Sequence, residues 1–123
     1  MRSTRLHCHV NAPRGAVYRA LLDAKAVATW MTGVGKTTAQ TDTFHGRFVK
    51  LVANEQVVEV VEFETTDASL QGEMTITIAL AAADRGTDVL AVHKGLPPGL
   101  STTDNETGWR SSLTKLAALV EGG

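Results

Sequence analysis

The sequence predicts an α+β fold in which a curved sheet grips a long C-terminal helix, and two patterns near its end carry this prediction. One is a strand on which Val89, Ala91 and His93 share a face, because successive side chains of a strand point to opposite sides. The other is a helix over residues 105–120, whose apolar side chains recur at offsets of four, seven, eight and eleven from Trp109. A strand followed by such a helix indicates a sheet packed on a helix, with a pocket between them.

The first third of the chain predicts one strand and two short helices. Residues 4–10 alternate apolar and polar side chains, which is typical of a strand with one wet face. Asn11 is expected to cap a first helix, and Pro13 is tolerated in its first turn, where the missing N–H costs nothing. Asp23 is expected to cap a second short helix over residues 24–30, which ends before a glycine-containing break.

The middle of the chain predicts antiparallel hairpins. Residues 46–53 and the valine-rich residues 56–65 are strand candidates, joined by the turn-forming pair Asn54-Glu55. Residues 74–80 show the cleanest two-residue period in the chain, and Asp84-Arg85-Gly86 turns the chain into the last strand. Strands in a run flanked by helices favour an α+β fold over a doubly wound sheet.

Composition excludes several classes of protein. The chain is 43% hydrophobic and 20% charged, so residues 1–123 are expected to form a single globular domain. Lysine and arginine number 12 against 13 acidic residues, without basic clusters, so nucleic-acid binding is not expected. No apolar run approaches the roughly 18 residues of a membrane span, and the N-terminus does not resemble a signal peptide. We expect a cytoplasmic protein, and the lone Cys8 agrees with a reducing compartment.

Residues 33–38, Gly-Val-Gly-Lys-Thr-Thr, look at first like the end of a phosphate-binding loop. The full pattern needs a glycine where Trp30 stands, with a strand before it and a helix after it. A helix is expected before this segment, and the residues after it are poorly suited to begin a helix. We therefore expect a loop that binds no nucleotide. No cofactor is expected anywhere in the chain.

His7 and His9 project from the same face of the first strand, where a pair of imidazoles would bind a metal if a further ligand approached. No Cys, Asp or Glu is expected on that face, and a structural zinc site needs about four ligands. We therefore expect exposed histidines and no metal site.

His93 and Glu59 are the candidate catalytic residues. On a concave face near Trp109, His93 would be buried, its pKa lowered and its imidazole neutral at pH 7. It would then hydrogen-bond either a bound polar group or a structural partner, and both interpretations stay open. Alternation does not decide whether Glu59 faces inward, because both faces of its strand carry valine. Inside the pocket Glu59 would have a raised pKa and act as an acid or base, whereas an exposed carboxylate is the ordinary interpretation.

Large side chains are concentrated on the surfaces that we expect to face the pocket. Methionine adapts to irregular ligand shapes and small residues leave space, although a plain hydrophobic core is the alternative for each position. The predicted lining residues are Trp30, Met31, Phe48, Phe63, Met74, Ile76, Ile78, Ala91, His93, Trp109 and Leu113.

Several short motifs in this order carry a family resemblance: Ala12-Pro13, Ala20-Leu21, Trp30-Met31, His45-Gly-Arg-Phe48, Gly86-Thr87, His93, and Gly108-Trp109 leading to Leu113 and Leu116. Over nearly the whole chain they resemble the START-like (SRPBCC) superfamily. The likeness is strongest to the branch labelled as homologues of the activator of the ninety-kilodalton heat-shock protein ATPase. The resemblance implies a helix-grip fold, with two small helices closing one end and a cavity between the sheet and the long helix.

Three functions from different classes follow as hypotheses. A carrier or sensor of a small apolar or amphipathic molecule needs only the cavity, so we prefer it and lean against an enzyme. A cyclase- or hydrolase-like enzyme would require His93 and Glu59 to reach the same void. A chaperone-associated module is suggested by the branch label alone. Separately, Leu90 and Val92 lie opposite His93 on their strand, and covering them by homodimerisation through the sheet is a further hypothesis.

Overall fold

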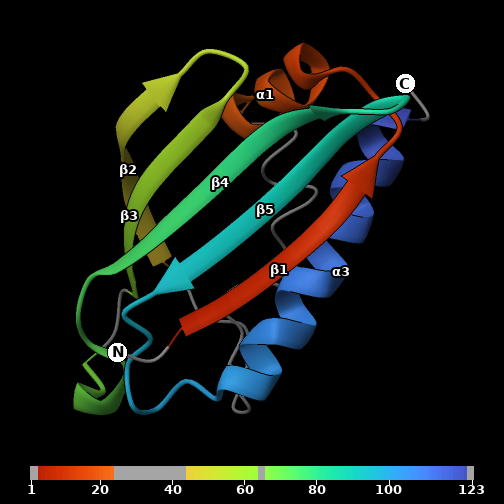
Figure 1. The fold of residues 1–123 in the computed structure, drawn as a ribbon. Helices are drawn as coiled ribbons and strands as arrows, with labels where there is room; N and C mark the ends of the chain where they lie inside the picture. The colour runs from red at the N-terminus through yellow and green to blue at the C-terminus, as the bar shows by residue number, and fades with distance from the viewer. Residues whose placement is uncertain (1–2, 24–43, 64–65, 122–123) are drawn as a thin grey trace.

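The computed structural model describes residues 3–23, 44–63 and 66–121. Its elements, drawn in Figure 1, are β1 (Ser3–Val10), α1 (Arg14–Leu22), β2 (Phe44–Val52), β3 (Gln56–Phe63), the 3-10 turn η2 (Ala68–Leu70), β4 (Met74–Ala83), β5 (Gly86–Lys94) and α3 (Thr102–Glu121). The predicted α+β order is confirmed, with the strands in a run and the long helix last.

Five strands form one antiparallel sheet in the order β1-β5-β4-β3-β2. The first strand of the chain therefore pairs with the last one, and β1 and β2 form the edges of the sheet. Asn54 and Arg85 have φ angles of 62° and 63°, so both predicted hairpin turns pass through the left-handed region. Figure 1 shows the sheet curving around α3, with α1 near one end.

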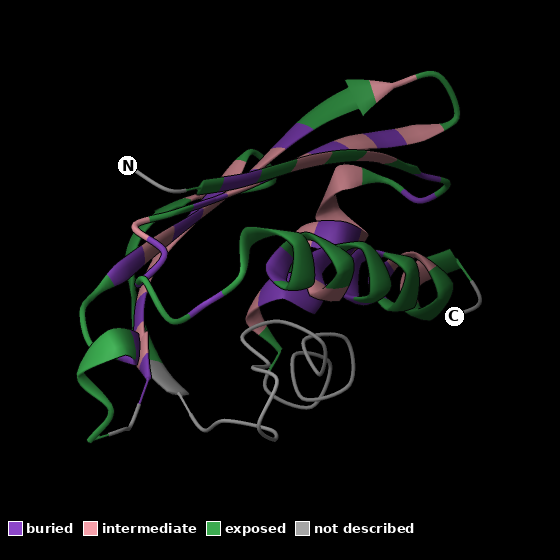
Figure 2. Cartoon of the chain, turned by 90° about the horizontal axis from the view of Figure 1, so that it is seen from below, coloured by how far each residue is buried: buried purple, intermediate pink, exposed green. Residues whose placement is uncertain are grey.

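One face of the sheet is buried, as the alternating patterns predicted. On β4, Met74, Ile76 and Ile78 are each at most 3% exposed, whereas the residues between them are only half-buried. The helix side of the core comes from α3, where Trp109 and Leu116 are at most 1% exposed. Figure 2 shows these buried segments of α3 turned toward the sheet, and the exposed ones turned away from it. The core therefore lies between the concave face of the sheet and α3.

The helix boundaries differ in part from the prediction. Pro13, rather than Asn11, is the residue before the first turn of α1, and no side chain caps that helix. The long helix begins at Thr102, three residues before the expected start at 105, and Ser101 Oγ accepts a hydrogen bond from the N–H of Asp104 at 3.2 Å. The predicted second short helix lies outside the described residues. No helix among residues 3–23, 44–63 and 66–121 has the length and apolar character needed to cross a bilayer.

Candidate binding site between β1 and α3

Strand β1 and helix α3 run side by side in the same direction and are joined by hydrogen bonds near both ends. At one end Asn105 Nδ2 donates to Thr4 Oγ1 at 2.9 Å, and at the other the backbone N–H of Asn11 donates to Glu121 Oε2 at 2.8 Å. The strand covers about 23 Å between these points at its usual rise, and the helix covers about 24 Å. The matching lengths allow both contacts to form together.

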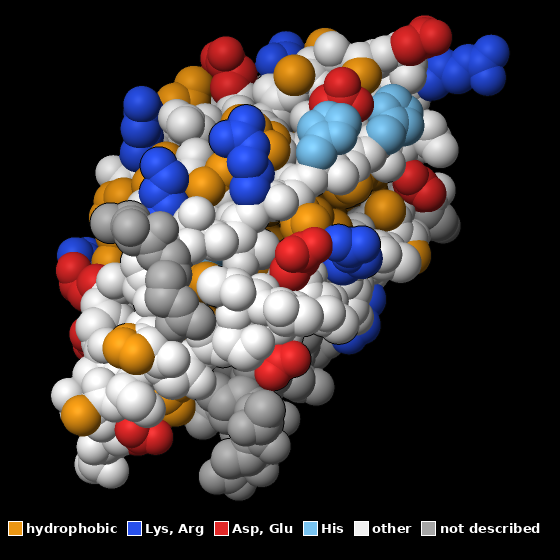
Figure 3. Space-filling view, turned by 60° about the horizontal axis from the view of Figure 1, so that its bottom comes forward, with side chains coloured by type: hydrophobic (Ala, Val, Ile, Leu, Met, Phe, Trp, Pro, Cys, Tyr) orange, Lys and Arg blue, Asp and Glu red, His pale blue; other side chains and the backbone are white. Residues whose placement is uncertain are grey.

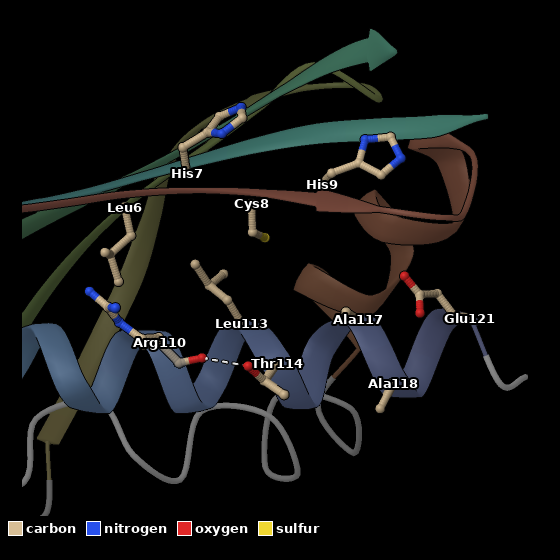
Figure 4. Close-up of a pocket in the computed structure, with 10 residues that line it drawn as sticks. All are labelled: Leu6, His7, Cys8, His9, Arg110, Leu113, Thr114, Ala117, Ala118 and Glu121. Carbon is tan, nitrogen blue, oxygen red and sulfur yellow. Dashed lines mark hydrogen bonds between the residues drawn. The ribbon is translucent and has the colours of Figure 1, made fainter. Parts of the chain in front are cut away.

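A pocket of about 600 Å³ lies between these two connections. It is lined by Leu6, His7, Cys8 and His9 of β1 and by Arg110, Leu113, Thr114, Ala117, Ala118 and Glu121 of α3. Figure 4 shows Leu6 and Cys8 pointing from the strand toward the helix, and Leu113 pointing from the helix toward Cys8. The space-filling view in Figure 3 shows apolar side chains in a hollow below two histidine rings. The pocket therefore has an apolar floor and opens at the edge of the sheet.

Charged groups lie at opposite ends of this pocket. Arg110 Nη2 lies 2.5 Å from Glu106 Oε1, and the arginine side chain remains 66% exposed. Glu121, which accepts the Asn11 hydrogen bond, lies at the other end (Figure 4). Burial, followed by the nearby charges of Asp88 and Glu121, raises the pKa of the Cys8 thiol. Cys8 is therefore a neutral part of the apolar floor at pH 7 rather than a thiolate nucleophile.

The outer face of β1 differs from the prediction in one respect, because an acidic residue does lie beside the histidines. Asp88 pairs with His9 across β1 and β5, and its Oδ1 is 3.2 Å from His9 Nδ1 and 3.9 Å from His7 Nε2. His9 Nε2 is also 3.1 Å from Asn11 Oδ1. Within the described part of the chain no group of three or more potential ligands is arranged to hold a metal ion.

His93 lies at the centre of a buried polar cluster. Trp109 donates its indole N–H to His93 Nδ1 at 3.0 Å, and Asn105 Nδ2 approaches the same nitrogen at 3.2 Å. Because an indole nitrogen only donates, Nδ1 is the acceptor and the imidazole proton is on Nε2, which lies 3.2 Å from Met74 Sδ. Burial lowers the pKa of His93 to about 4. His93 is therefore neutral at pH 7, with both ring nitrogens in contact with protein groups.

Glu59 faces the concave side of the sheet, which resolves the register that the sequence left open. It pairs with Ile76, and Ile76 pairs with His93, so the three occupy one row across β3, β4 and β5. Two strand spacings separate the backbone positions of Glu59 and His93 by about 10 Å across the sheet. Glu59 Oε2 leans instead toward β2, where it would lie 3.4 Å from a Cβ placed on Gly46. Burial raises the pKa of this half-buried carboxyl, and among the described residues no hydrogen bond or ion pair to it is observed.

The predicted cavity residues fall into three groups. Most lie in the buried core: Phe63, Met74, Ile76, Ile78, Ala91, His93, Trp109 and Leu113. Phe48 pairs with Glu59 on the edge strand β2 and is 44% exposed. Trp30 and Met31 lie outside the described residues, as do residues 33–38. Among the predicted set, Leu113 is the residue that also lines the β1–α3 pocket.

The strand side of this pocket was not predicted from the sequence. Leu6 and Cys8 were expected only as one face of a strand, and the decisive fact is that β1 forms an edge beside α3. On the helix, Arg110, Thr114 and Ala118 follow one another at four-residue intervals, which places them on one stripe next to the buried one. This four-residue spacing could indicate the helix side of the pocket, but only if the element that faces the stripe were known.

Several known proteins are similar to this chain. A crystal structure of protein CV1439 from Chromobacterium violaceum has 33% sequence identity and a TM-score of 0.85, over 97% of this chain and 96% of that one. Protein MLL2253 from Mesorhizobium loti shares the fold with 16% identity and a TM-score of 0.83, over 98% of each chain. The solution structure of the Aha1 dimer from Colwellia psychrerythraea has 19% identity and a TM-score of 0.72, over 98% of this chain and 97% of that one. No curated protein matches the sequence.

The sequence also matches a family described as Activator of Hsp90 ATPase homolog 1-like protein, over residues 11–121. The match covers α1, strands β2 to β5 and α3, whereas β1 lies just before it, and the START-like fold expected from the motifs is confirmed. The chain therefore belongs to the Activator of Hsp90 ATPase homolog 1-like protein family.

Proposed function

We propose that this protein binds a small amphipathic molecule in the pocket between β1 and α3. The observation that carries the proposal is a space of about 600 Å³ with an apolar floor and charged groups at its ends. Pockets for small molecules commonly measure roughly 300–1,000 Å³ and combine apolar walls with a few polar groups that orient the ligand. The pocket fits this description.

Its chemistry favours a ligand that is apolar along most of its length. Leu6, Cys8, Leu113 and Ala117 offer aliphatic or neutral thiol surface. Moving a ligand's apolar surface from water onto this floor would contribute about 25 cal/mol per Å² before the costs of binding are subtracted. The polar groups of the rim then select ligands with polar ends.

We favour binding over catalysis by the pair His93 and Glu59. Both nitrogens of His93 are engaged by Trp109 and Met74, so the imidazole offers no vacant position to a substrate proton. Glu59 leans away from it toward Gly46. A general base must come within hydrogen-bond reach of the proton it removes, and this geometry supports binding better than proton transfer.

A dye titration with paired variants tests the proposal. The probe is 8-anilinonaphthalene-1-sulfonate, an amphipathic molecule that fluoresces in apolar surroundings. Thr114→Trp places a bulky ring at the rim of the pocket. Because Thr114 is exposed, this substitution should not destabilise the fold. Leu119→Trp is the matched control, because Leu119 is 38% exposed on the same helix and does not line the pocket.

We expect one saturable dye site in the natural sequence and in Leu119→Trp, with at least tenfold weaker binding in Thr114→Trp. Circular dichroism spectra that coincide for the three proteins would show that the variants are folded. Equal dye affinity in both tryptophan variants, or no saturable binding to the natural sequence, would reject the β1–α3 pocket as the ligand site.

A further inference from the structure

The pocket touches four consecutive residues of β1, from Leu6 to His9. Successive side chains of a strand point to opposite faces, so a pocket on one face of the sheet would touch only every second residue. The pocket touches consecutive residues whose side chains point to opposite faces, so it runs along the backbone edge of the strand. Figure 4 shows this arrangement, with Leu6 and Cys8 directed toward α3 and His7 and His9 directed away from it.

That backbone edge is unpaired in the described structure. The sheet order places β1 at one end, and among the described residues β1 pairs with β5 alone. A strand directs alternate N–H and C=O groups to each of its sides, so half of the backbone groups of residues 6–9 point toward the pocket. Such an edge is a template for a further strand.

The opposite wall is one face of a helix. Counting from Arg110, the lining residues of α3 recur at offsets of three, four, seven, eight and eleven. Leu113 and Ala117 provide the apolar part of that face, opposite Leu6 and Cys8. An unpaired strand edge beside an apolar helix face accommodates an extended peptide, whose backbone pairs with the edge while alternate side chains enter the groove.

The charges at the two ends define a direction for that peptide. β1 and α3 run the same way, so Arg110 lies toward the beginning of β1 and Glu121 lies toward its end. A strand antiparallel to β1 would bring its amino terminus to Glu121 and its carboxyl terminus to Arg110. Each charge therefore faces the terminus of opposite sign. Arg110 has other N–H groups besides the one that contacts Glu106, and the hydrogen bond from Asn11 to Glu121 uses Oε2.

We propose that the amphipathic ligand of this pocket is a short extended peptide, which joins the sheet as a further strand antiparallel to β1. The inference rests on the proposed function and specifies the chemical class of its ligand. Residues 6–9 span about 10 Å, which corresponds to a peptide of about four residues. Alternate side chains of the peptide would be apolar and contact Leu113 and Ala117, and the others would face water.

Hydrogen exchange measured by NMR tests strand addition directly. The probe is the tetrapeptide Thr-Leu-Thr-Leu with free termini, and 1-decanol serves as an amphipathic ligand without amide groups. We expect the peptide to slow exchange at least tenfold at alternate amides within residues 6–9, because the amides between them already face β5. Decanol should bind without slowing any amide of β1. A peptide in which each backbone amide is N-methylated should bind at least tenfold more weakly.

The direction of the peptide is tested by its termini. Amidation of the carboxyl terminus should weaken binding about two- to fivefold in the natural sequence and have no effect in Arg110→Gln, because exposed ion pairs contribute little. Lys115→Gln is the control, since Lys115 is exposed on α3 outside the pocket. Decanol and dye binding without any peptide binding would overturn this inference and leave the proposed function standing. Absence of binding by peptide, decanol and dye alike would overturn both.

Discussion

Trp109 donates its indole N–H to Nδ1 of His93 at 3.0 Å, with the two ring centroids 6.0 Å apart in an edge-on arrangement. The contact joins α3 to β5 inside the core, where both side chains are 1% exposed. A buried imidazole needs partners for both nitrogens, and Trp109 supplies one of them. Of the interpretations left open by the sequence, the observed hydrogen bonds correspond to a structural partner for His93.

Replacement of Trp109 by phenylalanine should lower the free energy of unfolding by about 2 kcal/mol, because it removes the donor to a buried acceptor and leaves a void. Urea unfolding followed by far-ultraviolet circular dichroism measures the loss. Leu119→Ala is the control, since Leu119 is 38% exposed on the same helix and should cost under about 0.5 kcal/mol. Equal stability of Trp109→Phe and the natural sequence would contradict the structural role of this hydrogen bond.

Acid should destabilise the fold through His93. Its pKa is lowered from 6.5 to about 4 by burial, so between these values the unfolded chain binds a proton that the folded chain does not. The free energy of unfolding should therefore decrease as the pH falls through this range, by about 3 kcal/mol in total from this group. Urea unfolding at a series of pH values measures the slope. In His93→Gln, the slope of the unfolding free energy against pH should decrease by the contribution of one proton. An unchanged slope would show that His93 does not cause this pH dependence.

Glu59 should have the opposite effect. Burial raises the pKa of its carboxyl above the usual 4.5, so the folded state disfavours the charged form. The contribution of Glu59 therefore lowers the free energy of unfolding as the pH rises. Glu59→Gln should therefore stabilise the fold at pH 7, by about 0.5 kcal/mol because the half-buried side chain keeps some contact with water. The gain should disappear as the pH falls below the usual pKa of 4.5, because the carboxyl is then protonated in the folded and the unfolded chain. A loss of stability at pH 7 would instead indicate a favourable partner for the carboxylate.

The homodimer predicted from the sequence would form through the outer face of the sheet. Leu90 and Val92 lie half-buried on that face, where a second copy would cover them. Size-exclusion chromatography with light scattering should give twice the mass of the chain, and Leu90→Lys should halve it. Leu119→Lys, on the exposed side of α3, should leave the dimer intact. A single-chain mass at every concentration would reject the dimer.

The sequence predicted the parts of this fold that depend on local periodicity. The two-residue period of residues 74–80 and the helical spacing after Trp109 correspond to β4 and α3, because each pattern is produced by one face of a single element. The proximity of His93 to Trp109 followed from the expectation that the last strand packs on that helix. Burial and a lowered pKa of His93 followed in turn.

Features that depend on pairing between distant segments were not predicted. Asp88 lies beside His9 because β1 pairs with β5, 79 positions later in the sequence. The position of β1 at the edge of the sheet has the same origin, and it creates the pocket beside α3. Glu59 could not be assigned to a face because valines occupy both faces of β3, and only its pairing with Ile76 decided it. Long-range register, rather than residue type, was the missing information.

The most direct test of ligand binding between β1 and α3 is a ¹H–¹⁵N NMR titration with 8-anilinonaphthalene-1-sulfonate. We expect saturable shifts at residues 6–9 and at the lining residues of α3, with the indole N–H of Trp109 nearly unchanged. Those lining residues are Arg110, Leu113, Thr114, Ala117, Ala118 and Glu121. Shifts of that indole resonance and of resonances from β3 and β4, with residues 6–9 unaffected, would contradict binding between β1 and α3. They would place the ligand between the concave face of the sheet and α3 instead.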